Sequence, residues 1–230
     1  MRAILRLLCA AILIGSLANA GAAMAEEKPA MEARVESLLA QMTLEEKIGQ
    51  LIQLSNVGDT TGPLPDDETR RRNMELVKAG MIGSMLNVVG VEEVRIVQDY
   101  AVNNSRLGIP LIFGFDVVHG HKTSFPIPLG EAASWDLELI EESARIAAAE
   151  AAAQGLNWTF APMADISRDP RWGRVMEGAG EDPYLGAEIA VARVRGFQGN
   201  DLSRPETIAA TVKHFAGYGF SESGRDYNTV

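Results

Sequence analysis

The sequence predicts an α/β fold in which helices cover a parallel sheet, namely an incomplete (β/α)8 TIM-like barrel of which only the amino-terminal part is present. Apolar runs and amphipathic segments alternate along the chain, which is the order expected of successive βα units. The apolar runs are continuous rather than alternating, as in parallel strands that are buried on both faces. Polar residues follow several of these runs, at the edge where such barrels carry their functional sites.

Residues 1–25 have the pattern of a secretory signal peptide. Arg2 and Arg6 precede an apolar run that is too short to span a bilayer, and a small-residue cleavage motif follows it. We therefore expect an exported protein, periplasmic or secreted, whose mature part is residues 26–230. Cys9 is the only cysteine and would leave with the signal peptide. The mature chain would then have neither disulfides nor a thiol nucleophile.

The composition is that of an acidic globular protein. The formal net charge is −10, and the predicted signal peptide contributes only positive charge, so the mature chain would be more acidic still. An acidic surface disfavours nucleic acid and anionic membranes as partners. Hydrophobic residues make up 47% of the chain, which is enough for a buried core and excludes a disordered chain.

Helices are expected where apolar residues recur with a helical period or where capping residues stand. They are expected over residues 31–42, 43–51, a segment that ends at Ala79, 91–105, 136–155 and 183–195. Thr43 and Glu46 are spaced as a capping box. Asp136 and Asp182 are expected N-caps, and Gly80 is expected to end its helix in the left-handed conformation.

Strands are expected at short apolar runs that turn residues bound on both sides. The expected strands cover residues 81–87, 110–118, 158–166 and 207–215. Residues 58–67 are polar and contain glycine and proline, so a loop is expected there. No glycine-rich dinucleotide motif follows the first of these strands, and the chain has no Walker lysine motif, so a nucleotide-binding sheet is disfavoured.

Three of the expected strands deliver polar residues at or just after their carboxyl ends. Asp116 follows an otherwise apolar run, Asp165 lies at the end of the next strand, and Lys213 and His214 close the last one. Burying a charged group costs several kcal/mol unless the group is paired, so these residues need partners or a ligand. Their collection at one edge predicts a binding site there.

Residues 168–183 have no helical or strand period and are expected to form a long ordered loop. Arg168, Asp169 and Arg171 are expected to neutralise one another within it.

Arg174 in the same loop is a candidate ligand-binding residue. Gly173 beside it would let the backbone approach a neighbour closely, and Glu177 is spaced to hold its guanidinium. The loop therefore predicts a site for a polar ligand.

A metal-dependent hydrolase is the alternative interpretation. His119 and His121 follow the strand that ends near Asp116, and two histidines at this spacing can share a metal ion. Against this, His214 is the only other histidine in the chain, and Gly120 indicates that the strand has already ended. We therefore assign no metal ligand and expect no cofactor.

Several separated motifs together resemble family 3 glycoside hydrolases, in particular the periplasmic β-glucosidases of bacteria. The motifs are Met42–Leu51, Phe113–Gly120, Arg168–Arg174 with Glu177, Glu181–Tyr184, Lys213–Phe215 and Arg225–Val230. They occur in the order typical of that family and cover essentially the whole mature chain.

The resemblance implies retaining hydrolysis of terminal non-reducing β-D-glucosyl residues from β-glucosides or oligosaccharides, through two carboxylates and a covalent glycosyl intermediate. It implies substrate-binding roles for Asp116, Arg174, Lys213 and His214, each of which would bind hydroxyls of one glucose unit.

In the family, the nucleophile lies on a later strand of the barrel and the proton donor in a second domain. Neither is expected before Val230, so we assign no catalytic residue here. Residues 26–230 are expected to be an inactive, truncated amino-terminal fragment of the barrel domain, whose partner is the missing carboxyl-terminal part of the same chain.

Two further functions are compatible with these motifs. One is an exported β-N-acetylhexosaminidase of the same family, although the Lys213–Gly219 segment is not followed by the histidine typical of that branch. The other is a sugar-binding remnant without catalytic activity.

Overall fold

The computed structural model describes residues 30–55 and 67–226, so the predicted signal peptide and most of the predicted 58–67 loop lie outside the described residues. The chain divides into two compact units, Met1–Lys47 and Ile48–Val230. Within the described residues, no helix is both long and apolar enough to cross a membrane.

The first unit contains a helix over residues 30–41, after which α2 (Leu44–Gly49) begins. The predicted capping box at this start is confirmed. The Glu46 backbone N–H donates to Thr43 Oγ1 at 3.2 Å, and the Thr43 backbone N–H donates to Glu46 Oε2 at 2.9 Å. The helix ends at Gly49, two residues before the predicted end at Leu51.

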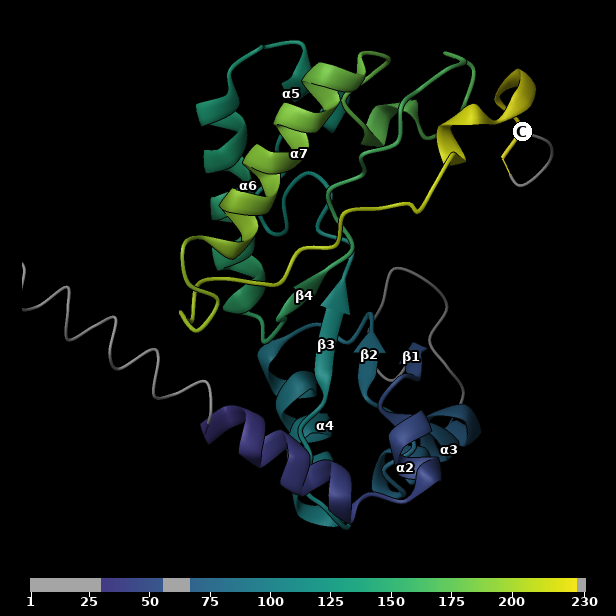
Figure 1. Cartoon of the computed structure of the whole chain (residues 1–230), viewed down its shortest axis with the longest axis vertical. Helices are drawn as coiled ribbons and strands as arrows, with labels where there is room; N and C mark the ends of the chain where they lie inside the picture. The colour runs from purple at the N-terminus through teal and green to yellow at the C-terminus, as the bar shows by residue number, and fades with distance from the viewer. Residues whose placement is uncertain (1–29, 56–66, 227–230) are drawn as a thin grey trace, which may run out of the picture. The chain divides into compact units, whose positions relative to one another are not determined.

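The second unit is built on a parallel sheet with the strand order β1-β2-β3-β4 (Figure 1). The strands are β1 (Gln53–Ser55), β2 (Ser84–Leu86), β3 (Ile112–Phe115) and β4 (Trp158–Thr159). Each strand pairs with the next one in parallel register, so that Met85 lies between Leu54 and Phe113. The predicted α/β class and parallel sheet are thereby confirmed.

Helices follow these strands along the chain, as βα units require. They are α3 (Asp67–Lys78), α4 (Val91–Asn104), α5 (Pro128–Ala132), α6 (Leu137–Ala152) and α7 (Pro183–Gln198). Asp136 and Asp182 cap α6 and α7, accepting hydrogen bonds from the backbone N–H groups of Leu139 and Leu185 at 3.0 and 2.8 Å. Gly80 has φ 69°, the left-handed conformation predicted after the preceding helix.

Two short elements of the structure were not predicted from the sequence. Strand β1 was not predicted, because it follows the predicted end of α2 so closely that the sequence shows no separate apolar run for it. Helix α5 was not predicted either, since five residues are too few to show a helical period.

The predicted strands 158–166 and 207–215 are also only partly formed. The two segments join through isolated parallel bridges, Trp158 of β4 with Ala209 and, beyond β4, Met163 with Lys213. Backbone hydrogen bonds connect them, such as Thr159 N–H to the Ala209 carbonyl at 2.8 Å. Pro162 interrupts the ladder because proline has no N–H to donate.

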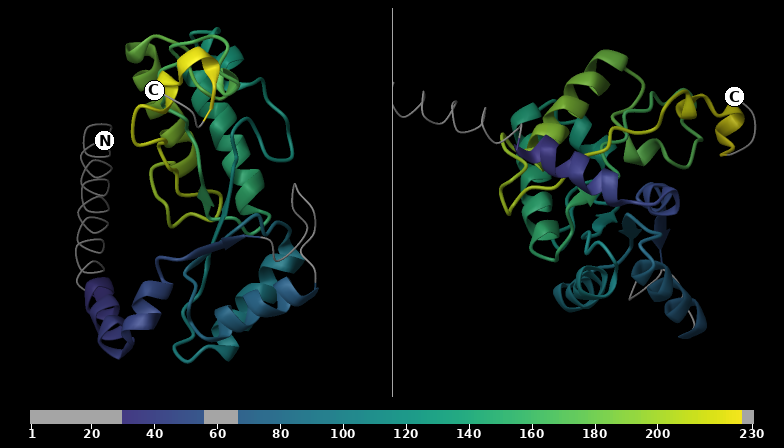
Figure 2. Two further views of the ribbon diagram at one scale, coloured as in Figure 1. Left: turned by 90° about the vertical axis from the view of Figure 1, so that its right-hand side faces the viewer. Right: turned by 60° about the horizontal axis from the view of Figure 1, so that its bottom comes forward.

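The core of this unit lies between the sheet and its helices. Phe113, Met85 and Phe197 are fully buried in the larger apolar cluster, and a smaller cluster lies between α5, α6 and α7. Helices α6 and α7 lie side by side (Figures 1 and 2). Gly196 permits this approach, because a Cβ there would overlap with the α6 backbone at Glu141.

Candidate functional site

Asp116 and Lys213 meet at the carboxyl edge of the sheet, although 97 residues separate them in sequence. Lys213 Nζ donates to Asp116 Oδ1 at 2.8 Å. The Lys213 side chain is 14% exposed, whereas that of Asp116 is 50% exposed. The Asp116 carboxylate is therefore anchored on one side and open to a ligand on the other.

His214 is held in place by Asp165. The buried Asp165 Oδ2 accepts from the His214 backbone N–H at 3.0 Å and lies 2.8 Å from His214 Nδ1. An ionised carboxylate can only accept hydrogen bonds, so Nδ1 carries the proton and Nε2 is left for other contacts. Asp165, which the sequence placed at a strand end without a binding role, orients the histidine.

Arg174 and Glu177 form the predicted ion pair. Arg174 Nε and Nη2 donate to Glu177 Oε1 and Oε2, both at 2.6 Å, and the 3-10 turn η1 (Val175–Glu177) brings the two side chains together. The hydrogen bonds from Arg174 lower the pKa of Glu177. The same hydrogen bonds raise the pKa of the Arg174 guanidinium. Two parallel bonds fix the orientation of the guanidinium plane.

The predicted site residues come together in the structure. Arg174 Nη1 donates to the Tyr218 hydroxyl at 3.4 Å, and the His214 ring packs edge-on against the Tyr218 ring. The neighbouring Lys213 and His214 side chains also lower the pKa of Glu177, after the larger effect of the hydrogen bonds from Arg174. Lys213 in turn binds Asp116. We refer to Asp116, Arg174, Lys213 and His214 as the strand-end cluster.

Three neighbours of this cluster were not predicted as site residues. Asp226 accepts hydrogen bonds from Trp172 Nε1 at 2.8 Å and from the Tyr218 hydroxyl at 2.7 Å. Both hydrogen bonds lower the pKa of the Asp226 carboxyl, and the one from Trp172 has the larger effect. Trp172 and Asp226 lie inside motifs that carry the family resemblance, which is the only sequence signal that singles them out.

The remaining charges of the Arg168–Pro183 loop have structural roles. Arg171 pairs with Asp169 at 2.5 Å and lowers the pKa of that carboxyl to about 2. Arg168 instead stacks over the Phe220 ring at 4.6 Å, so the expected neutralisation within the loop holds only for the other two. A Cβ at Gly173 would meet no described atom within 4 Å, so the described chain makes no close approach there.

His119 and His121, the candidate ligands of the metal-dependent hydrolase interpretation, contact phenylalanine residues. His119 Nδ1 lies 3.2 Å from the Phe125 carbonyl oxygen, and His121 packs edge-on against Phe115 with ring centroids 5.7 Å apart. Burial is the main cause that lowers the pKa of His121. Within the described ranges, no group of three or more potential ligands is arranged to hold a metal ion.

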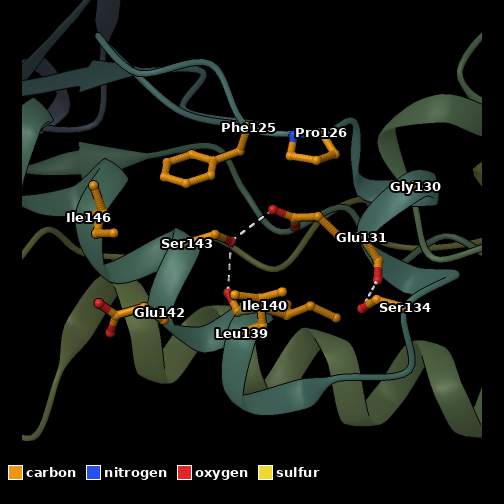
Figure 3. A pocket seen from close by; sticks show the side chains of 10 residues that line it. All are labelled: Phe125, Pro126, Gly130, Glu131, Ser134, Leu139, Ile140, Glu142, Ser143 and Ile146. Atoms are coloured by element: carbon orange, nitrogen blue, oxygen red, sulfur yellow. Dashed lines mark hydrogen bonds between the residues drawn. The ribbon is translucent and has the colours of Figure 1, made fainter.

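An apolar pocket lies elsewhere, between α5 and α6, and Phe125 and Pro126 line one side of it (Figure 3). Its volume is about 200 Å³. Its buried polar groups already have partners, since Ser143 Oγ donates to Glu131 Oε1 at 2.8 Å. A ligand rich in hydroxyls needs open donors and acceptors, so the strand-end cluster is the better candidate.

Comparison with known proteins places this geometry in a family. Residues 43–230 match the model of the glycosyl hydrolase family 3 N-terminal domain, so the chain belongs to that family. The periplasmic β-glucosidase of Salmonella typhimurium is 45% identical over 201 residues, which are 87% of this chain and 25% of the relative. The lysosomal β-glucosidase of Dictyostelium discoideum is 34% identical, over 84% of this chain and 26% of its own length.

Solved structures agree with this assignment. The β-glucosidase of Listeria innocua in complex with isofagomine superposes with a TM-score of 0.75 at 45% identity, over 86% of this chain and 28% of that enzyme. The same enzyme in complex with glucose gives a TM-score of 0.76 at 43% identity, with the same coverage. This chain thus spans about a quarter of the length of the relatives named here.

Proposed function

We propose that this chain forms the glucose-binding part of a retaining β-glucosidase. The observation that carries the proposal is the convergence of the strand-end cluster, in which the open Asp116 carboxylate lies with Lys213, Arg174 and His214, in a chain of glycosyl hydrolase family 3. Structures of the Listeria enzyme with glucose and with laminaribiose support a β-glucoside or oligosaccharide as substrate.

The strand-end cluster suits a polyhydroxylated ring. Sugar hydroxyls both donate and accept, so they need partners of both kinds. The Asp116 carboxylate would accept from hydroxyls, while the Lys213 ammonium, the Arg174 guanidinium and His214 Nε2 would bind the remaining ones. Because Glu177 and Asp165 already fix Arg174 and His214, little side-chain entropy would be lost on binding.

The chemical step requires two further carboxyl groups, one as nucleophile and one as proton donor. We assign neither role to a residue of this chain, and we propose that both belong to the three quarters of the relatives' length that it does not span. Residues 26–230 alone would then bind sugar at most. We also propose a periplasmic location, which the predicted signal peptide and the name of the Salmonella relative support.

We expect the full-length enzyme, meaning a chain of the relatives' length that begins with residues 1–230, to hydrolyse p-nitrophenyl β-D-glucoside. Proton NMR of the reaction should show β-glucose as the first product, because a retaining mechanism preserves the anomeric configuration. Residues 26–230 alone should show no turnover. Large apolar side chains that the described structure leaves exposed, such as Val212 and Phe215, should also make them prone to aggregate.

Parallel assays with the β-xyloside and the β-N-acetylglucosaminide test the alternatives. A faster reaction with the N-acetylglucosaminide would favour the hexosaminidase, and a full-length enzyme without any turnover would favour the sugar-binding remnant. Activity of residues 26–230 alone would contradict the assignment of the missing carboxyl groups.

The substitution Arg174→Lys tests the guanidinium in the strand-end cluster. Lysine keeps the charge but lacks the planar guanidinium group. Its single ammonium cannot form two parallel hydrogen bonds with Glu177 and also bind a ligand. We expect a higher KM and a lower kcat in the full-length enzyme, each changed about tenfold. Arg171→Lys is the matched control, because Arg171 is exposed and pairs only with Asp169 in the described structure. Unchanged kinetics in Arg174→Lys would assign Arg174 a structural role.

A further inference from the structure

Residues 218–226 pack tightly against the loop that contains Arg168. The Arg168 backbone N–H donates to the Gly219 carbonyl at 3.2 Å. A Cβ at Gly219 would overlap with the carbonyl of Ile166, and one at Gly224 would overlap with the backbone of the same loop. The two glycines therefore allow a close contact that any side chain at these positions would prevent.

This contact brings the Asp226 carboxylate to two aromatic donors. Trp172 is 2% exposed, and its indole N–H donates to Oδ1 at 2.8 Å. The Tyr218 hydroxyl donates to Oδ2 at 2.7 Å. Both oxygens of one carboxylate are thus used to fix two aromatic side chains, whose rings meet edge to face with centroids 5.2 Å apart.

Tyr218 in turn contacts two members of the strand-end cluster. Its hydroxyl accepts from Arg174 Nη1 at 3.4 Å, and the Arg174 guanidinium lies 5.3 Å from the ring centroid. The His214 ring packs edge-on against the Tyr218 ring, with centroids 4.6 Å apart and planes 80° from parallel. One tyrosine therefore restricts both a guanidinium and an imidazole.

We infer that Asp226 is a positioning residue, which holds Tyr218 by its hydroxyl and thereby places Arg174 and His214 for the sugar. This inference rests on the proposed function, because it assigns the network to binding of the same glucose unit. In the described structure, Asp226 forms no hydrogen bond with Arg174 or His214. It would therefore act on them through Tyr218.

A purely structural role for Asp226 would be to satisfy the buried Trp172 N–H, since an unpaired buried donor is costly. Tyr218→Phe separates the two roles. It removes only the hydroxyl, so the Trp172–Asp226 bond and the packing of the ring on His214 remain possible. If positioning is the role, losing the hydroxyl weakens sugar binding even though the buried indole stays satisfied.

The experiment measures KM for p-nitrophenyl β-D-glucoside and the inhibition constant of glucose in the full-length enzyme. We expect Tyr218→Phe and Asp226→Asn each to raise both constants about tenfold, with a smaller change in kcat. The double variant should be no worse than the poorer single one, because both substitutions break the same chain of contacts.

Asp201→Asn is the matched control. Asp201 is an exposed carboxylate that also accepts two hydrogen bonds, both from Ser203, at 2.9 and 2.7 Å. In the Asp201→Asn variant, KM and the inhibition constant of glucose should both match the wild-type values. If Tyr218→Phe binds glucose like the wild type, or if Asp226→Asn lowers only the thermal midpoint, the positioning role is overturned. A wild-type enzyme without glucosidase activity would overturn the proposed function instead, and this inference with it.

Discussion

Replacing Asp116 by asparagine should lower kcat/KM for an aryl β-glucoside between about tenfold and a hundredfold in the full-length enzyme. Asparagine keeps the shape but replaces one acceptor oxygen by a donor and removes the charge. A hydrogen bond to a charged group contributes about 1.5–3 kcal/mol, which corresponds to this range. Asp116 is half-exposed, and the amide oxygen can still accept from Lys213, so the thermal midpoint should hardly change.

Asp99→Asn on α4 is the control for this prediction, because Asp99 is an exposed aspartate on the surface of a helix. It should leave both kinetic constants unchanged. If Asp116→Asn hydrolyses the substrate as fast as the wild type, the carboxylate serves only to anchor Lys213, and the proposed sugar site loses its acceptor.

Replacing Glu131 by glutamine should destabilise the second unit by about 3–5 kcal/mol. Glu131 Oε2 accepts from Arg193 Nη1 at 2.5 Å, and the two side chains are 8% and 5% exposed. Burial lowers the pKa of the Arg193 guanidinium, and the Glu131 carboxylate opposes that effect. Glutamine keeps the size and an acceptor but leaves Arg193 as a buried cation without a counter-charge.

The thermal midpoint measures this effect, and two further variants sharpen the test. Glu142→Gln removes an exposed partner of Arg145 and should change nothing measurable, because exposed ion pairs contribute little. Combining Glu131→Leu with Arg193→Met should recover part of the loss, since an apolar pair needs no counter-charge. A Glu131→Gln variant as stable as the wild type would show that the ion pair is dispensable.

Local patterns predicted the features of this chain that depend on neighbouring residues. The caps at Asp136 and Asp182 each join a side chain to a backbone N–H three residues later, and Arg174 pairs with a side chain three residues later. The gathering of Asp116 and Lys213 at one edge also followed, because all strands of a parallel sheet end on the same side.

Features that depend on distant segments were not predictable in this way. Asp226 meets Trp172 across 54 residues and Arg193 meets Glu131 across 62, and neither pair shows a periodic pattern. The segment after β4 was predicted as a regular strand because its composition is apolar, whereas the missing N–H of Pro162 limits it to isolated bridges. Three-residue strands such as β1 are set by pairing with their neighbours rather than by their own sequence.

The buried cation Arg193 also connects helix α7 to the segment beside the proposed sugar site. It sits on α7 and donates to the carbonyl oxygen of Val118, two residues beyond Asp116. Gly196, one turn after Arg193 on the same helix, lies in the seam between α6 and α7, where a Cβ would overlap with the Glu141 carbonyl. We therefore expect substitutions in this seam to shift the Val118 segment and, through it, Asp116, so directed evolution of affinity at the proposed sugar site can also target residues outside the strand-end cluster.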